Sequence, residues 1–192
     1  MVRLIDSTTI DLNFNQFKWA KFRSAKAGIK RHTVYDPNAA IPVYFSLTDA
    51  KVNDAKELNS LPMIPNTTYV VDRAYNNYRW FYSLDKQNSK FVGRIKTHTC
   101  YEVKKILTPI GAGIIADEII RLSSIKGKAH CPIDLRRVTF MRAEDQKKLI
   151  FITNDLSRTA AEIAALYKQR WDIELFFKWI KKFKNQAFYQ SK

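Results

Sequence analysis

The chain has 192 residues, enough for one domain with a substantial hydrophobic core and an inserted subdomain. Apolar residues make up 46% of it, which excludes an intrinsically disordered polymer. With 33 Lys and Arg against 18 Asp and Glu, its net charge of +15 favours a polyanionic partner; a merely basic, soluble surface is the simpler alternative. No segment combines an apolar face with a basic one, so an anionic membrane is a weaker candidate.

The cysteines and histidines give no sign of a disulfide framework or a zinc site. Cys100 and Cys131 are only two, and His32, His98 and His130 lack zinc-ligand spacing with them. We interpret the histidines as structural or surface residues. Because the sequence shows no signal peptide, transit peptide or long apolar run, we expect a reducing, cytosolic location and no membrane partner.

The N-terminal half alternates short β-rich runs with turns and helical segments. Strands are predicted at residues 2–8, 29–35, 41–47, 67–72 and 90–96. Helical character is predicted at residues 53–61 and 76–87.

From about residue 98 to 152 the pattern changes. Strands are predicted at residues 101–107, 135–141 and 148–153, with Gly111 and Gly113 marking a turn, while residues 114–122 suit either a strand or a helix. Because this stretch interrupts the first pattern, we interpret it as a β-rich insertion. The predicted organisation is therefore a first part of the core at 1–97, the insertion at 98–152 and the rest of the core at 153–192.

The last element is the clearest. Thr159 and Glu162 fit a capping box, and the helix that follows is expected to run to about residue 183. The order of elements is typical of an α/β fold, a mixed sheet flanked by helices.

Four residues of this helix carry chemistry: Tyr167, Arg170, Glu174 and Lys181. At about 100° per residue they fall within roughly 60° of one another around the helix. Since the neighbours of Glu174 are mostly apolar, a carboxylate buried there needs a cation nearby. The simpler alternative is a solvent-facing ion pair between Arg170 and Glu174.

Two aspartates, Asp6 and Asp72, end apolar strands. A single aspartate in such a place is usually a cap or turn residue. Two of them together with the helix glutamate supply the hard oxygen ligands that Mg²⁺ prefers. A pair of such ions activates an attacking hydroxyl and stabilises the leaving oxygen in phosphodiester chemistry.

These residues resemble the IS-four group of bacterial insertion-sequence transposases, which belong to the DDE class. The resemblance rests on the spacing of the four helix residues and on Ile5-Asp6-Ser7-Thr8-Thr9 and Val71-Asp72-Arg73-Ala74-Tyr75. The basic run 21–32 and the segment 174–181 also look like family sequence. The resemblance extends from residue 2 to about residue 183.

The resemblance implies an RNase H-like fold, interrupted by a β-rich insertion before the last catalytic helix. It implies that Asp6, Asp72 and Glu174 are catalytic and hold two divalent ions, Mg²⁺ or Mn²⁺. Water then cuts the phosphodiester at the transposon end, and the freed 3′ hydroxyl attacks again, in some members forming a hairpin before joining target DNA. The residues expected to bind DNA phosphates are Arg73, Tyr167, Arg170 and Lys181.

The implied partners are double-stranded DNA, as terminal repeats and as target, and a second transposase protomer. The implied setting is the bacterial cytoplasm, in association with the nucleoid. Ala74 and Asn77 stand where relatives usually carry Gly and often Asp. The insertion lacks the Trp that some relatives stack on a flipped base, which leaves Tyr101 or Phe140 for that role.

The ends of the chain predict a fragment of a longer transposase. Met1 directly precedes the first catalytic strand, and eleven residues follow Lys181. One alternative function is therefore a catalytically inactive DNA-binding remnant, or an inhibitor of a full-length transposase. Another is a general RNase H-like nuclease or Holliday-junction resolvase, which shares the metals but not the helix stripe.

Overall fold

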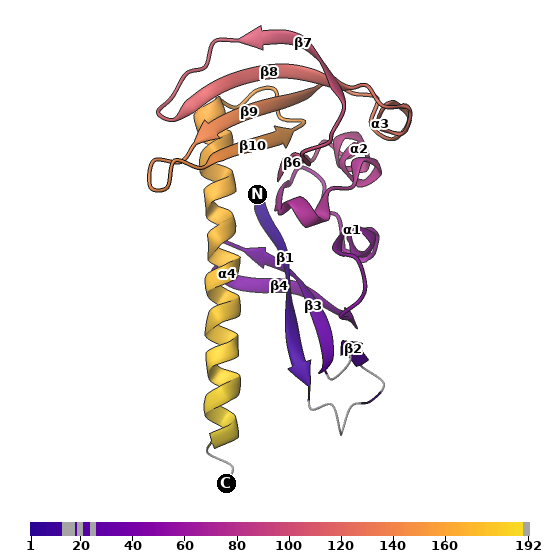
Figure 1. Ribbon diagram of the computed structural model, residues 1–192, viewed down its shortest axis with the longest axis vertical. Coiled ribbons are helices and arrows are strands. Elements are labelled where there is room, and N and C mark those ends of the chain that lie inside the picture. Colours follow the sequence, from indigo (N-terminus) through magenta and orange to yellow (C-terminus); the bar gives the residue numbers. More distant parts are fainter. Residues whose placement is uncertain (13–17, 19–20, 24–25, 190–192) are drawn as a thin grey trace.

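The computed structural model describes residues 1–12, 18, 21–23 and 26–189 (Figure 1). Its strands are β1 (Val2–Leu12), β2 (Lys21–Arg23), β3 (Lys26–Asp36), β4 (Ile41–Asp49), β5 (Thr68–Val71), β6 (Lys90–Arg94), β7 (Tyr101–Leu107), β8 (Ile114–Leu122), β9 (Leu135–Met141) and β10 (Lys148–Thr153). Its helices are α1 (Asp54–Glu57), η2 (Leu58–Ser60), η3 (Arg73–Tyr75), α2 (Tyr78–Lys86), α3 (Ile125–His130) and α4 (Ala160–Tyr189). The predicted basic run 21–32 lies partly outside the described residues.

The described strands form one mixed sheet in the order β2-β3-β1-β5-β6-β10-β9-β8-β7, and β4 pairs with β3. Strand β1 pairs antiparallel with β3 and parallel with β5, which in turn pairs parallel with β6. Strand β10 pairs antiparallel with β6, so the β-rich stretch continues the sheet of the core (Figure 1). The residue limits of the three predicted parts stay a prediction.

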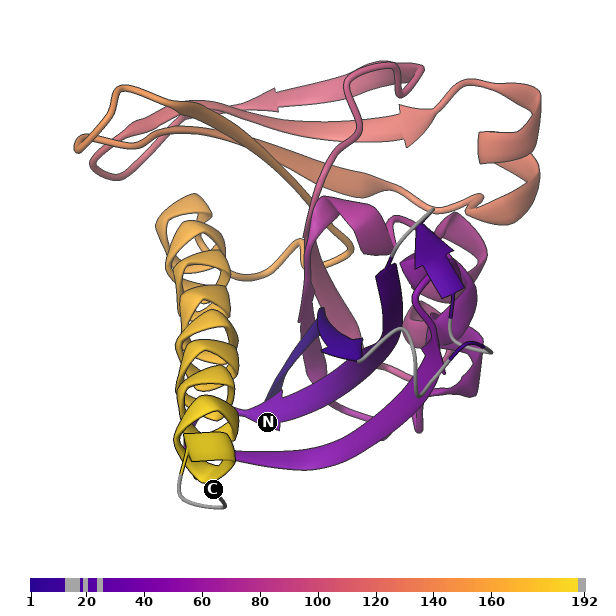
Figure 2. The same ribbon diagram turned by 60° about the horizontal axis from the view of Figure 1, so that its bottom comes forward.

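The two faces of the central strands bury different side chains, because successive residues of a strand point to opposite faces. Leu4, Val70 and Val92 pack in one hydrophobic cluster with residues of α4. Ile5 and Val71 pack in the other, with residues of α2. Figures 1 and 2 show α4 on one side of the core sheet and α1, α2 and α3 on the other. Side chains two residues beyond Leu4 and Val70 therefore lie on the face that α4 covers.

The helices begin where the sequence supplies caps. Asn53 caps α1, and the side chain of Asn77 accepts a hydrogen bond of 3.2 Å from the Trp80 amide at the start of α2. The predicted helix at 76–87 is thus confirmed. Asn77, which stands where relatives often carry Asp, has a clear local role, because both residue types are good N-caps. No helix among the described residues has the length and apolar character needed to cross a lipid bilayer.

Two local expectations are corrected. Residues 114–122, which suited a strand or a helix, form strand β8 and pair with β7 on one side and β9 on the other. Helix α4 continues to Tyr189 instead of ending near residue 183. Residues 184–189 contain neither proline nor glycine, so nothing in that stretch interrupts the helical hydrogen bonds.

Candidate active site

Asp6 and Asp72 are neighbours because of the parallel pairing of β1 with β5. Ile5 lies opposite Val71 in that pairing. Asp6 is the residue after Ile5, within β1, and Asp72 is the residue after Val71, just beyond the end of β5. Both follow by two residues a side chain, Leu4 or Val70, that packs against α4. The strand register therefore directs the two carboxylates to the same face.

Helix α4 meets these carboxylates with the residues of the predicted stripe. The hydroxyl of Tyr167 donates a hydrogen bond of 3.2 Å to Asp72 Oδ1. The guanidinium of Arg170 donates from Nη1 to Asp6 Oδ2 over 3.1 Å, and from Nη2 to Glu174 Oε1. One aromatic hydroxyl and one arginine thus connect three carboxylates that come from three separate elements.

The simpler interpretations of these residues do not describe the structure. The side chains of Arg170 and Glu174 are 15% and 28% exposed, and Arg170 also bonds Asp6, so their pair is not an isolated surface ion pair. Asp72 occupies the N-cap position of η3, yet its side chain makes no capping hydrogen bond there. Its carboxylate accepts from Tyr167 of α4 instead.

Burial and neighbouring negative charges both affect the pKa of Asp6. Burial raises the pKa of Asp6 to about 6, and the charges of Asp72 and Glu174 act in the same direction. The Ser7 amide, which donates to Asp6 Oδ1 over 2.8 Å, and the charge of Arg170 act against them. The cluster holds more negative charge than its single arginine neutralises.

Burial and the charge of Asp72 also affect the pKa values of Arg170 and Tyr167. Burial works to lower the pKa of the Arg170 guanidinium, but the surrounding acidic groups outweigh it and raise that pKa above its ordinary value. Burial raises the pKa of the Tyr167 hydroxyl to about 12; Arg170 opposes this and Asp72 adds to it. Arg94, at the end of β6, also acts to lower the Tyr167 pKa, so a further cation stands near the cluster.

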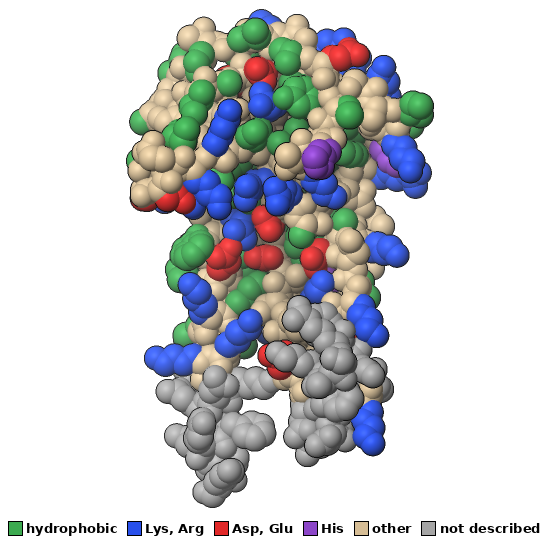
Figure 3. Space-filling model, viewed as in Figure 1, with side chains coloured by type: hydrophobic (Ala, Val, Ile, Leu, Met, Phe, Trp, Pro, Cys, Tyr) green, Lys and Arg blue, Asp and Glu red, His purple; other side chains and the backbone are tan. Residues whose placement is uncertain are grey.

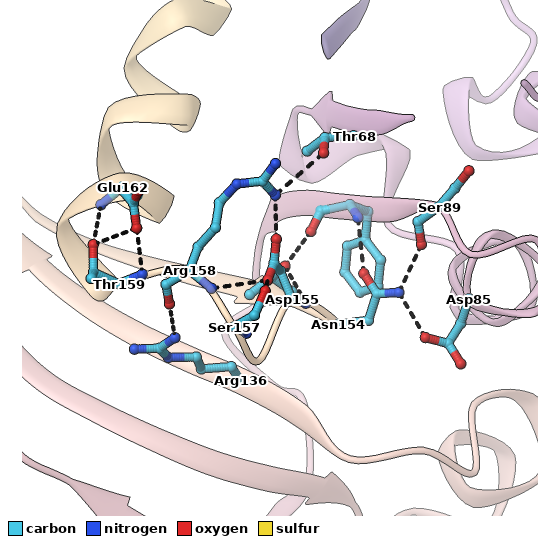
Figure 4. Close-up of polar contacts among 12 residues, drawn as sticks. Thr68, Asp85, Ser89, Arg136, Asn154, Asp155, Ser157, Arg158, Thr159 and Glu162 are labelled. Atoms are coloured by element: carbon cyan, nitrogen blue, oxygen red, sulfur yellow. Dashed lines mark hydrogen bonds and ion pairs between the residues drawn. The ribbon is translucent and has the colours of Figure 1, made fainter. Parts of the chain in front are cut away.

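A polar network fixes the start of α4 against the sheet (Figure 4). The buried Asp155 accepts hydrogen bonds from the Ser157 amide over 3.0 Å and the Arg158 amide over 3.1 Å, and forms an ion pair with the Arg158 guanidinium. Asn154 accepts from the Phe91 amide over 2.9 Å, which joins this turn to β6. The network sets where the stripe of α4 lies relative to the strand-end aspartates.

The predicted capping box is also present. The Thr159 hydroxyl accepts from the Glu162 amide over 3.2 Å, and the Glu162 carboxylate accepts from the Thr159 amide over 2.7 Å. Two donors at the helix start are thereby satisfied, as the sequence predicts.

Within the described part of the chain, no hydrogen bond or ion pair joins the remaining predicted residues to the carboxylates. Arg73 is exposed in η3, directly after Asp72, and Lys181 is exposed on α4 with no contact to the cluster among the described residues. Phe140 packs in the core against Phe151, at 6.4 Å between ring centroids. Tyr101 is half-buried at the start of β7, with the Arg137 guanidinium 5.2 Å from its ring centroid.

The donor set suits a hard divalent cation by type, but not by its present arrangement. No group of three or more Asp, Glu, His or Cys side chains among the described residues is spaced to hold a metal ion. The guanidinium of Arg170 lies between two of the carboxylates instead. The oxygen ligands and the excess negative charge fit Mg²⁺ or Mn²⁺ once Arg170 gives up these bonds.

Comparison with known proteins identifies the family and the fold of the chain. Residues 1–189 match the family model described as a transposase DDE domain. A protein of Sinorhizobium fredii named as a transposase is 41% identical over 94% of this chain and 51% of its own length. A transposase of an insertion sequence from Geobacillus stearothermophilus is 29% identical over 96% of this chain and 48% of its own length. The chain thus spans about half the length of these relatives.

A solved structure shows the same fold. The piggyBac transposase in its synaptic complex with hairpin DNA superimposes with a TM-score of 0.56 at 10% identity, over 94% of this chain and 40% of that one. The expected α/β, RNase H-like sheet with flanking helices is confirmed. Membership of the IS-four group in particular stays a prediction. With the match over nearly its whole length, the chain belongs to the family of transposase DDE domains.

Proposed function

We propose that this chain is the catalytic domain of a DNA transposase that cuts and joins phosphodiester bonds at insertion-sequence ends. The observation that carries the proposal is the meeting of Asp6, Asp72 and Glu174, from β1, the end of β5 and α4. Arg170 bonds two of these carboxylates, and Tyr167 bonds Asp72. Three carboxylates held close together repel one another, and a bound cation would relieve that repulsion. The three side chains would hold two Mg²⁺ or Mn²⁺ ions.

When bound, such ions activate the attacking hydroxyl and stabilise the leaving oxygen. The side chains of the chain supply binding and orientation. The planar fork of Arg170, freed from Asp6 and Glu174, matches two oxygens of a phosphodiester. With a pKa of about 12, Tyr167 keeps its proton at neutral pH and serves as a hydrogen-bond donor. Arg73 and Lys181 extend the cationic surface on either side.

The proposed partner is double-stranded DNA, first as terminal repeats and then as target, bound together with a second transposase protomer in the cytoplasm at the nucleoid. The names of the relatives and the DNA in the piggyBac complex support this choice of partner. The net charge of +15 suits a polyanion.

A nicking assay tests the proposal. Supercoiled plasmid and linear DNA are incubated with the chain and Mn²⁺ or Mg²⁺, for wild type and for Asp6→Asn, Asp72→Asn and Glu174→Gln, which keep side-chain shape. Asp172→Asn is the matched control, since Asp172 lies on the same helix and loses the same charge. We expect metal-dependent nicking that falls by at least about a hundredfold in the three variants and persists in the control.

Full nicking in all three variants overturns the proposal. Binding of DNA by the wild-type chain without any cleavage favours the inactive remnant instead, which the intact cluster argues against. Nicking without joining of the cut ends to a second DNA favours a general nuclease.

A further inference from the structure

A pocket lined by cationic side chains lies next to the carboxylate cluster. It has a volume of about 240 Å³ and opens where β6 leads into β7, bordered by residues of β9 and β10. Five of its lining residues are cationic: Arg73, Arg94, Lys96, Arg137 and Lys148. Three others carry hydroxyl groups: Thr97, Thr99 and Tyr101. None of the described residues that line it is acidic.

The strand register places this pocket beside the candidate active site. Val70 lies opposite Val92 in the parallel pair of β5 and β6, so Arg94 ends its strand level with Asp72. Arg73 is the next residue after Asp72. The pocket and the carboxylate cluster are therefore adjacent parts of one surface.

The positive charges of the pocket are largely uncompensated. Of the five cations, only Arg137 forms an ion pair within the described part of the chain, with Glu118. The Nε of Arg137 is nevertheless buried without a hydrogen-bond partner. Figure 3 shows Lys and Arg side chains gathered across the middle of this face, below strands β7 to β10, with acidic side chains directly beside them. Like charges held this close favour an anionic ligand.

We propose that this basic pocket binds backbone phosphates of the DNA strand that enters the carboxylate cluster. The inference rests on the proposed function, because it takes DNA as the substrate. A strand with one phosphate at the carboxylates carries its next phosphates a few ångströms away, since the charges of one strand repeat about every 3.4 Å along the duplex axis. Cations with neighbouring hydroxyl donors are the groups that proteins use to hold such phosphates. Because the pocket lies beside the cluster, one polymeric anion can occupy both, which a small isolated anion cannot do.

Salt-dependent binding to a fluorescent DNA duplex tests the pocket. Anisotropy is measured without divalent metal between about 50 and 300 mM KCl. The pocket variant is Lys96→Gln with Lys148→Gln, two exposed side chains whose loss leaves the core intact. Its matched control is Lys105→Gln with Lys147→Gln, exposed lysines of β7 and of the turn before β10 that do not line the pocket. Both pairs lower the net charge by the same amount.

We expect the pocket variant to flatten the slope of log affinity against log salt by about 1.8, or 0.9 for each lost phosphate contact, and to lose at least about tenfold in affinity at low salt. The control is expected to keep the wild-type slope. Equal slopes for the two double variants overturn the proposal, because net charge alone would then explain the loss of affinity. Competition of a mononucleotide as strong as that of duplex DNA also overturns it in favour of a small-anion site.

The two proposals fail in different ways. If the wild-type chain does not nick DNA with Mn²⁺, the proposed catalytic function fails while the slopes still decide whether the pocket binds DNA. If nicking depends on the carboxylates but the pocket variant behaves like its control, only the pocket inference fails.

Discussion

Arg170 holds the carboxylate cluster together in the absence of metal. It bonds Asp6 and Glu174 at once, and its side chain is only 15% exposed. Removing one partner from a buried charge network leaves the other charges uncompensated. The free energy lost in this way is usually larger than the net stabilisation that the intact network provides. In the proposed metal centre these bonds would open before both carboxylates bind a cation. Arg170 would then both stabilise the metal-free chain and compete with the metal.

The variant Arg170→Gln tests this double role. We expect the free energy of unfolding to fall by about 2 kcal/mol without metal, because Asp6 and Glu174 lose the cation that they share. We expect Mn²⁺ to raise the Tm of this variant more than that of wild type, since nothing then competes for Asp6 and Glu174. Thermal unfolding with and without Mn²⁺ measures both effects.

The control for this variant is Arg142→Gln, which breaks an ion pair with Asp145 whose side chains are 42% and 45% exposed. It is expected to cost little, because exposed pairs contribute at most about 1 kcal/mol. An unchanged Tm and an unchanged response to Mn²⁺ in Arg170→Gln contradict the shared-cation account.

The sequence predicted the central residues better than their surroundings. Asp6, Asp72 and the stripe on α4 follow from strand and helix periodicity, which fixes the face that each side chain occupies. Arg94 and Lys148 were not singled out, because their meeting depends on the pairing of β6 with β10 across more than fifty residues of chain. The sequence did hold one signal for Arg94: it ends the strand that follows the Asp72 strand, and parallel neighbours bring their ends together.

At the scale of elements, the turn between β10 and α4 joins the start of α4 to the sheet. Asp155 is 1% exposed and satisfies the amides of Ser157 and Arg158. Burial works to raise the pKa of this carboxyl, but its hydrogen bonds and the charge of Arg158 outweigh burial and lower it. The ionised carboxylate is thus the form that the folded turn requires.

Replacing Asp155 by Ala is expected to lower the free energy of unfolding by about 2–3 kcal/mol, because buried amides lose their acceptor and Arg158 loses its partner. Urea denaturation measures this loss, and Asp145→Ala, at an exposed turn, serves as the control with an effect below about 1 kcal/mol. A displaced α4 should also reduce nicking. Equal denaturation midpoints for the two variants contradict the proposed role of the turn.

Elements whose state depends on distant partners were the least predictable. Periodicity alone left residues 114–122 open, and the pairing of β8 with strands on both sides decides for a strand. The six-residue helix α3 was missed, since it is short and contains Gly127. A Cβ at Gly127 would lie 2.8 Å from Ser124 Oγ and 2.9 Å from Leu122 Cβ. Close packing therefore requires glycine in a position where helix propensity disfavours it.

At the scale of the whole molecule, the sequence predicted a mixed sheet flanked by helices, but not that the β-rich stretch extends the core sheet. One residue that holds distant parts together is His32 of β3. It is fully buried, with Nδ1 3.0 Å from the Tyr75 hydroxyl and Nε2 3.0 Å from Thr48 Oγ1. It is a structural histidine, one of the two roles that the sequence suggested.

His32 makes folding stability depend on pH. Burial lowers the pKa of His32, and the charge of Lys30 acts in the same direction. The charges of Asp54 and Glu57 act to raise it, but burial outweighs them. A depressed pKa in the folded state means that the unfolded chain binds the proton first, so this stabilisation is present above pH 6.5 and is lost as the pH falls below it. Burial acts in the opposite sense at Asp6: its raised pKa contributes stability that is fully present below pH 3.8 and is lost as the pH rises through about 6.

Comparison of wild type with His32→Gln separates the two groups. We expect the free energy of unfolding of wild type, measured by urea denaturation, to fall more steeply than that of the variant between about pH 7.5 and 5.5, by up to about 1.4 kcal/mol per pH unit. Identical pH profiles for the two proteins contradict the assignment to His32.

The most direct test of the carboxylate cluster is to count the Mn²⁺ ions that it binds. The electron paramagnetic resonance signal of free Mn²⁺ is followed as the ion is titrated into the chain with a DNA duplex present, for wild type and for Asp72→Asn with Glu174→Gln. Two ions per chain are expected for wild type, and neither for the double variant. Equal binding of Mn²⁺ by the two proteins would contradict a metal centre built from Asp6, Asp72 and Glu174.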